Sequence, residues 1–110
     1  MSSEPIFLMN TPILQNADMS ASQTSAVVDM AEVIGYAAHS IWTGTPVGDV
    51  VLEVSNDGIN FVPIDTQATA GIAGQHVVNI ERMHIRYARC RYERTSGTGS
   101  ITIYLSAKDL

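Results

Sequence analysis

Side chains that could do chemistry are few in this 110-residue chain, which holds three histidines and one cysteine. His39, His76 and His84 do not form an HExxH pair, and the thiol of Cys90 has no second metal ligand beside it in the sequence. Cys90 lies in a strand-like run, where a small buried side chain is its ordinary role. We therefore expect no metal centre and an inert thiol, with an intersubunit contact or a reactive thiol as the alternatives for Cys90.

Side-chain oxygens gather in the segment Asn56-Asp57-Gly58-Ile59-Asn60, where they could contact Ca²⁺. A calcium site uses about six to eight oxygens, several of them from carboxylates, whereas this segment supplies one carboxylate. Asn, Asp and Gly are also the residues that tight turns prefer, so we expect a turn here. The sequence also lacks a glycine-rich nucleotide loop, a GxSxG motif and any paired acid and base. It thus predicts a protein that is not an enzyme and needs no cofactor.

The strongest polar feature is a run of arginines. Five of the six basic residues fall within thirteen positions: Arg82, Arg86, Arg89, Arg91 and Arg94. With Glu93 this segment carries a charge of +4, so the rest of a chain whose net charge is −5 carries −9. Arginine forms planar pairs with carboxylates and tolerates burial at interfaces. The polarised charge therefore predicts that the arginine segment of one subunit meets an acidic face of another.

Two alternatives for the arginines stay open at this point. The first, with equal weight, is pairing across strands within one subunit, with Glu53 or Glu93 as the acidic partner. The second is a nucleic-acid face, in which strand arginines beside Tyr87 and Tyr92 contact phosphates or bases. The negative net charge opposes that role, and we expect no nucleic-acid partner.

Strands must position these residues, because apolar and polar side chains alternate with period two between clusters of Gly, Pro, Asn and Asp. Within 33–42, Tyr36, Ala38 and Trp42 share a face. Within 49–55, Val50, Leu52 and Val54 face inward, while Asp49, Glu53 and Ser55 face outward. We expect hairpins that join 49–55 to 61–64 and 85–94 to 100–107, and further strands at 26–30 and 76–80. About eight strands predict an all-β fold, a single antiparallel β-sandwich of jelly-roll or immunoglobulin-like type.

The first sixteen residues differ in kind from the rest. Pro5 and Pro12 bracket four apolar residues, Ile6, Phe7, Leu8 and Met9, which predicts an extended N-terminal arm (1–16) rather than a regular strand, followed by the sandwich domain (17–110). The arm could lie along its own sandwich as an edge strand or add to a neighbouring subunit. Four apolar residues are too few for a membrane span or a signal peptide, so we expect synthesis in the cytoplasm.

Three motifs in order resemble small β-sandwich structural proteins of bacteriophage virions. They are the segment 17–25 (ADMSASQTS), then Ile41-Trp42-Thr43-Gly44 with Val47-Gly48, then 55–61 (SNDGINF). The closing segment also resembles that of those proteins, at 85–89 (IRYAR) and 94–100 (RTSGTGS). The resemblance covers residues 17–107 and leaves the arm outside. The aromatic residue after the SNDG turn is often Trp in those proteins and is Phe61 here.

The resemblance implies a capsid decoration, vertex or minor capsid component, made in the host cytoplasm and resident in the virion. Its partners would be other virion or capsid proteins and copies of itself, so we expect a homo-oligomer that contacts its neighbours through Ile6, Phe7, Leu8, Met9 and the five arginines. The SNDG turn also occurs in discoidin-like carbohydrate-binding modules, so a module for host attachment is the alternative. That module needs exposed aromatic side chains, whereas Tyr36, Trp42 and Phe61 are expected in the core.

Overall fold

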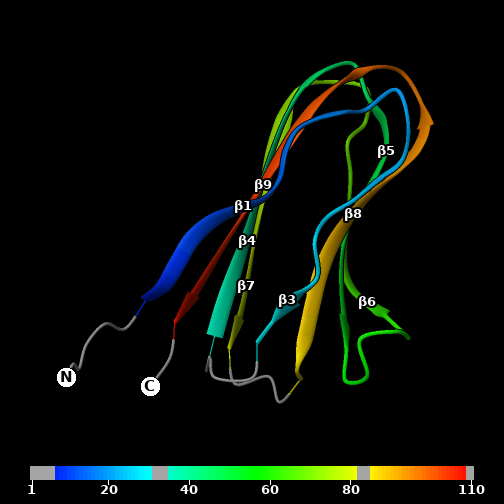
Figure 1. Ribbon diagram of the computed structural model, residues 1–110. Coiled ribbons are helices and arrows are strands. Elements are labelled where there is room, and N and C mark those ends of the chain that lie inside the picture. The colour runs from blue at the N-terminus through cyan, green and yellow to red at the C-terminus, as the bar shows by residue number, and fades with distance from the viewer. Residues whose placement is uncertain (1–6, 31–34, 82–84, 109–110) are drawn as a thin grey trace.

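Alternating side chains and turn residues build two antiparallel sheets that pack face to face (Figure 1). The computed structural model describes residues 7–30, 35–81 and 85–108. These residues form nine strands and no helix: β1 (Phe7–Asp18), β2 (Gln23–Thr24), β3 (Val28–Asp29), β4 (Gly35–Gly44), β5 (Val47–Ser55), β6 (Val62–Ala68), β7 (Gly74–Glu81), β8 (Tyr87–Ser96) and β9 (Gly99–Lys108). The prediction of an all-β antiparallel sandwich is confirmed.

The strand order places side by side strands that are far apart in the chain. The first sheet has the order β1-β9-β4-β7, and the second has the order β2-β8-β5-β6, with β3 also paired to β8. Residues 26–30, expected to form one strand, contribute only the short strand β3. Both β3 and β2, which precedes it in the chain, pair with β8. Every long strand except β6 therefore pairs with a strand that is not its neighbour in the chain.

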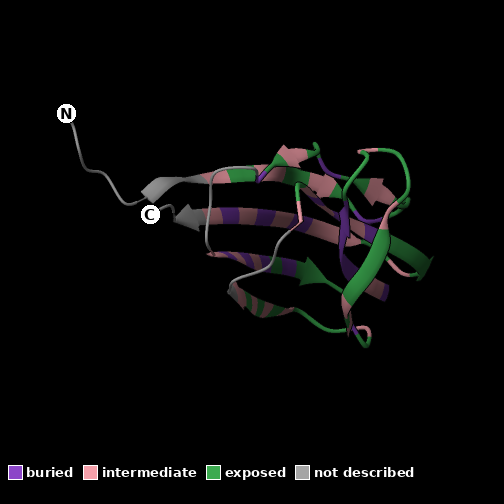
Figure 2. Ribbon diagram, turned by 90° about the horizontal axis from the view of Figure 1, so that it is seen from below, coloured by how far each residue is buried: buried purple, intermediate pink, exposed green. Residues whose placement is uncertain are grey.

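The core lies between the two sheets and follows from the alternation (Figure 2). Tyr36, Ala38 and Trp42 point into it from β4, as expected, and Ile101 and Ile103 point into it from β9. Each large apolar side chain that is buried in this way contributes about 1.5–3 kcal/mol. Trp42 also satisfies its polar atom, because Nε1 donates a hydrogen bond to the carbonyl oxygen of Ile72 at 2.9 Å.

The hairpin between β5 and β6 is confirmed, but the expected hairpin between residues 85–94 and 100–107 is wrong. β8 lies in the second sheet and β9 in the first, so the turn between them carries the chain across the sandwich. The connection from β4 to β5 crosses in the same place, and the backbone N–H of Thr45 donates to the carbonyl oxygen of Thr98 at 2.8 Å. Gly97, at φ 79°, fits there because it has no Cβ. A Cβ at this position would lie 2.1 Å from the carbonyl oxygen of Thr45.

The N-terminal segment is a strand where the structure describes it, whereas the sequence predicted an extended arm that is not a regular strand. β1 runs antiparallel to β9, with register shifts after Phe7, Pro12 and Leu14. Of the two alternatives for this segment, the structure shows the edge strand on its own sheet. Pro12 is tolerated there, because an edge strand does not need every backbone N–H for pairing.

Strand β5 is buried on both faces, which corrects the expectation that Glu53 and Ser55 face solvent. Val50, Leu52 and Val54 face the core, and Val51, Glu53 and Ser55 on the opposite face are each 5% exposed or less. The neighbours β8 and β6 flank β5 on either side, and Arg89 and Arg91 of β8 reach across to Glu53 on its outer face. A charged group therefore lies in a place from which water is largely excluded.

Candidate functional site

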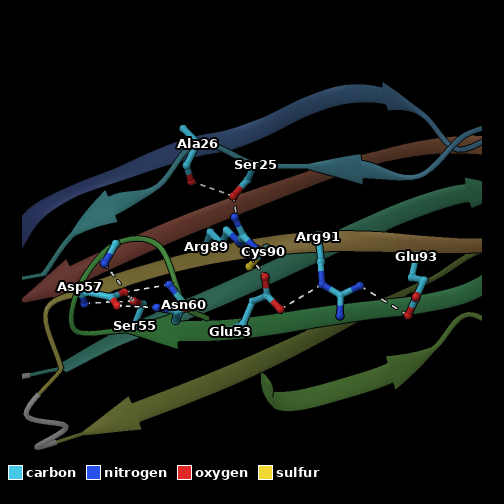
Figure 3. Close-up of polar contacts among 11 residues, drawn as sticks. Ser25, Ala26, Glu53, Ser55, Asp57, Asn60, Arg89, Cys90, Arg91 and Glu93 are labelled. Atoms are coloured by element: carbon cyan, nitrogen blue, oxygen red, sulfur yellow. Dashed lines mark hydrogen bonds and ion pairs between the residues drawn. The ribbon is translucent and has the colours of Figure 1, made fainter. Parts of the chain in front are cut away.

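Two arginines of the segment predicted as a contact surface, Arg89 and Arg91, lie on the outer face of the second sheet. Arg89 lies opposite Glu53 in the register between β8 and β5, and Arg91 lies opposite Val51. Arg89 Nε donates a hydrogen bond to Glu53 Oε1 at 2.6 Å, and Arg91 Nε donates to Oε2 at 3.0 Å (Figure 3). One buried carboxylate thus fixes the orientation of two arginine side chains, each of which is 29% exposed.

The electrostatics of this cluster keep Glu53 ionised. Burial raises the pKa of the Glu53 carboxyl, but hydrogen bonds and charges from Arg91 and Arg89 outweigh burial and hold the pKa below its usual range. Arg91 also approaches Glu93, with 3.4 Å between Nη1 and Oε1. The pairing alternative, in which Glu53 or Glu93 of the same subunit accepts the arginines, is therefore what the structure contains.

Phe61 belongs to this cluster and not to the core, which corrects the sequence-based expectation. The guanidinium carbon of Arg89 lies 3.9 Å from the centroid of the Phe61 ring, and the ring is only partly buried. A guanidinium stacked on a ring in this way gains a cation–π attraction of about 0.5–1 kcal/mol at a partly exposed site. Arg89 is consequently held on two sides, by Glu53 and by Phe61.

The other predicted contact residues are spread apart. Arg86 pairs with Asp29, with 3.1 Å between Nη2 and Oδ2, and Arg94 Nε donates to the carbonyl oxygen of Gly97 at 3.1 Å. Arg82 and Ile6 lie outside the described residues. The backbone of Phe7, Leu8 and Met9 belongs to β1, and their side chains lie outside the described part of the chain. The assembly role of all these residues stays a prediction.

The segment between β5 and β6 shows the expected turn chemistry. Asp57 Oδ1 accepts hydrogen bonds from the backbone N–H groups of Ile59 and Asn60 and from the Ser55 hydroxyl, each at 2.8 Å, and Oδ2 accepts one from the Asn60 amide at 2.7 Å. These bonds, that of the Asn60 N–H first, hold the pKa of Asp57 well below its usual range. Both carboxylate oxygens therefore serve the turn.

Two of the three histidines have ordinary partners, and the cysteine is buried. His39 Nε2 lies 2.9 Å from Gln75 Oε1, and His76 Nε2 lies 2.8 Å from Asp65 Oδ2, while His84 is outside the described residues. Cys90 is 1% exposed, and burial, with smaller effects of nearby acidic charges, raises the pKa of its thiol to about 12. In the described ranges no three His, Cys, Asp or Glu side chains gather as a metal site would require.

Sequence reasoning missed the central position of Glu53, although the sequence held a signal for it. Val51 breaks the alternation of the run 50–54, and a nearly continuous apolar run indicates a strand that is buried on both faces. A single Glu in such a run needs a cationic partner, because an unpaired buried charge is very costly. The arginine segment was the available source of that partner.

The fold is shared with proteins of prophage and viral origin. The SPBc2 prophage-derived protein YomS superposes with a TM-score of 0.61 at 3% identity, over 96% of this chain and 99% of that chain. The PBSX exported protein XepA gives a TM-score of 0.66 at 15% identity, and infectious bursal disease virus, Gx strain, gives 0.54 at 12%. These two matches cover 94% and 96% of this chain but only 36% and 32% of theirs.

No protein-family model and no curated protein matches the sequence. At such low identities the similarity to solved structures establishes the fold alone. The resemblance to virion sandwich proteins thus has support from prophage-derived structures at the level of fold and none from a sequence family. In the described part of the chain, no helix is long and apolar enough to cross a membrane.

Proposed function

We propose that this protein is a structural component of a bacteriophage virion and acts through subunit-subunit contacts rather than catalysis. The observation that carries the proposal is the end-to-end match to prophage-derived YomS, in which nearly the whole of each chain is the same sandwich. The three sequence motifs that resemble virion sandwich proteins point to the same class of protein.

The architecture of the sandwich suits a structural component of a virion. A virion component makes the same contacts many times, and this requires rigid surfaces that are presented in a fixed geometry. The second sheet meets this requirement, because Glu53 and Phe61 hold Arg89 in one orientation. Arg86 and Arg94 are exposed at either end of β8 and are the arginines from which we expect a contribution to contacts with neighbours.

The carbohydrate-binding alternative has little support in the side chains. Sugar recognition on a sandwich needs an aromatic ring whose face is open to the ligand. Tyr36, Trp42 and Tyr92 are 4% exposed or less, and Arg89 covers a face of Phe61. Tyr87 lies beside Arg86 and Tyr104 is partly buried, so we do not propose this role. Binding to a glycan array above background would reopen it.

The direct test is the protein content of purified particles. We expect peptides of this chain in gradient-purified particles of the source phage, or of its induced lysogen, at a fixed ratio to the major capsid protein. A soluble lysis enzyme from the same lysate controls for carry-over. If the protein is abundant in the lysate but absent from washed particles, the proposed function is wrong.

A further inference from the structure

The edge strands of the two sheets differ in how well they are protected from pairing with another chain. An edge strand presents unpaired backbone N–H and C=O groups, and proteins block such edges with short strands, prolines, bulges or charges. In the described part of the chain, the first sheet has the edge strands β1 and β7. The second sheet has β6 at one edge and β2 and β3 at the other. β2 and β3 are each two residues long, so they offer little to another strand.

β1 and β6 are long enough to pair with another chain, but both are interrupted. Pro12 lies in β1, and the pairing of β1 with β9 contains three register shifts. Pro63 lies in β6, and the pairing of β6 with β5 contains one register shift. A proline removes a backbone donor, and a bulge interrupts the ladder and bends the strand. Neither strand therefore offers a regular edge along its whole length.

β7 has a regular edge without these interruptions. Its eight residues pair with β4 one by one, from Gly74 opposite Trp42 to Glu81 opposite Gly35, without a register shift. It contains no proline, and its one Asp, Glu, Lys or Arg is its last residue, Glu81. Among the described strands it pairs with β4 alone. The backbone groups that point away from β4 thus form a regular row of donors and acceptors about 27 Å long, at about 3.4 Å per residue.

The side chains of β7 are partly uncovered on both faces of the sheet. Val78 and Ile80 face the other sheet and pack against the core, yet both are only partly buried. Val77, on the outer face, is 59% exposed. A strand on the free edge of β7 would cover these side chains as well as the backbone groups, because side chains opposite each other on paired strands lie only about 5 Å apart.

We propose that β7 pairs in antiparallel orientation with β7 of a second copy of this chain, so that the first sheets of the two copies join into one. The edge requires an extended strand whose apolar residues alternate onto the core side of the sheet. A second β7 is such a strand, with Val78 and Ile80 on that side. Its own edge is free as well, so a single contact pairs the backbone groups of both copies.

The side chains of β7 fit a pairing centred on Val77. A two-fold axis perpendicular to the sheet sets one residue of the strand opposite its own copy. With Val77 at the axis, Gln75 lies opposite Asn79 on the outer face, so that amide meets amide and valine meets valine. The two Glu81 residues then lie at opposite ends of the ladder, whereas a parallel pairing would set these like charges side by side. The position of this charge therefore favours the antiparallel pair.

Backbone hydrogen bonds supply the affinity of this contact. Residues 74–80 of the two copies face one another in this register, and an antiparallel ladder of this length contains about six to eight hydrogen bonds. A typical protein–protein interface contains about ten. When a strand is added to a sheet edge, these main-chain bonds give the affinity, and alternate side chains give the specificity. The role of the dimer in a particle rests on the proposed function, whereas the self-association does not.

Two lysine substitutions on the outer face of the first sheet test the proposal. Val77 lies on the edge strand β7, and Ile41, which is 37% exposed, lies one strand further in, on β4. We expect sedimentation velocity of the purified full chain, from about 1 µM to 1 mM, to show a monomer–dimer equilibrium. Val77→Lys should weaken it at least tenfold, because it sets like charges together at the centre of the ladder. Ile41→Lys should leave it unchanged, whereas a contact through the face of the sheet would be weakened by both.

Hydrogen exchange of the backbone amides, followed by NMR, locates the contact in the unaltered chain. At concentrations at which the dimer dominates, every second amide of β7 should exchange more slowly than in the monomer, since alternate N–H groups point to the free edge. The amides of β7 that already pair with β4, and those of β6, should not change.

Circular dichroism establishes that each variant is folded, and Asn79→Lys, on the same strand, replaces Val77→Lys if that variant is not. A monomer up to about 1 mM, a dimer without added protection in β7, or equal effects of the two lysine substitutions overturns the proposal. Because these measurements use only the purified chain, a dimer through β7 together with absence from particles would reject the proposed function and keep this inference. Presence in particles with no dimer would do the reverse.

Discussion

At the scale of single residues, the Glu53 carboxylate has the largest consequence for stability. Each of its oxygens accepts a hydrogen bond from one arginine, and the residue is 3% exposed. Loss of one partner from a buried ion pair costs about 3–5 kcal/mol, and the partial exposure of Arg89 and Arg91 reduces this figure. We expect Glu53→Gln to lower the free energy of unfolding by about 2–3 kcal/mol at pH 7, measured by urea titration. Glu93→Gln, at the exposed end of the cluster, should cost less than about 0.5 kcal/mol.

The same carboxylate predicts a pH dependence. Burial acts to raise the pKa of Glu53, but Arg91 and Arg89 outweigh it, so the folded pKa lies below the ordinary value of 4.5. A lowered folded pKa means that Glu53 contributes stability above pH 4.5 and loses it as the pH falls toward the folded pKa. The difference in urea midpoint between the wild type and Glu53→Gln should therefore be constant from pH 7 to 5 and shrink below pH 4.5. An equal difference at pH 3 would contradict this assignment.

Ala70 is a residue in an unfavourable backbone conformation. Its φ is 60°, in the left-handed region, where a Cβ costs about 1–2 kcal/mol. We expect Ala70→Gly to stabilise the protein by about 0.5–1 kcal/mol in thermal unfolding, because relief of this strain exceeds the added entropy of the unfolded chain. Ala73→Gly in the same loop, where φ is negative, should instead lower stability. Equal changes in the two variants would mean that the backbone at Ala70 is not strained.

At the scale of elements, the two crossings between the sheets depend on close backbone approach. Gly97 and Gly58 have similar positive φ values, 79° and 76°, but different surroundings. A Cβ at Gly97 would meet the backbone oxygen of Thr45 at 2.1 Å, whereas one at Gly58 would lie 3.4 Å from the Tyr87 ring, an ordinary contact.

We therefore expect Gly97→Ala to cost at least 2 kcal/mol more than Gly58→Ala, roughly the strain of a forced backbone shift in a packed structure. Gly58→Ala should cost only about 1–2 kcal/mol, for its left-handed backbone. Urea unfolding followed by Trp42 fluorescence measures both. Similar losses in the two variants would show that the crossing adjusts to a methyl group.

Local pattern predicted the strands well but not their partners. Period-two alternation placed Tyr36, Ala38 and Trp42 on the core face of β4, since alternation depends only on neighbours in the sequence. The turn at residues 95–99 looks the same whether the next strand pairs with the last one or crosses to the other sheet. The geometry that decides this is the contact with Thr45, about fifty residues away in the chain. The hairpin prediction failed for that reason.

The candidate site was predicted in composition but not in arrangement. The arginines and the possible pairing with Glu53 were evident from the sequence, whereas the choice between pairing within the subunit and pairing between subunits needed the register between β5 and β8. Phe61 was expected in the core because it follows a turn and is aromatic, yet it lies under Arg89.

At the scale of the whole molecule, the sheet order makes some strands far more important than others. β9 lies inside the first sheet, between β1 and β4, and it supplies Ile101, Ile103 and Leu105 to the core. β1 lies at the edge of the same sheet and pairs only with β9 among the described strands. Removal of β9 leaves both β1 and β4 with an unpaired edge, whereas removal of part of β1 uncovers a single edge.

Two truncations separate these roles. Removal of residues 99–110 should leave a chain without near-ultraviolet circular dichroism, since β9 carries three core side chains. Removal of residues 1–12 should keep the fold, because Leu14 and Ala17 still pack on the core and Met19 stays buried, but should lower stability by a few kcal/mol. It also exposes the half of β9 that Phe7–Pro12 had covered, and an uncovered edge strand pairs with other chains, so this variant should aggregate more than the full chain. If it instead keeps full stability and stays monomeric, residues 7–12 add nothing to their own sheet, and their use as an arm on a neighbouring subunit becomes the better explanation.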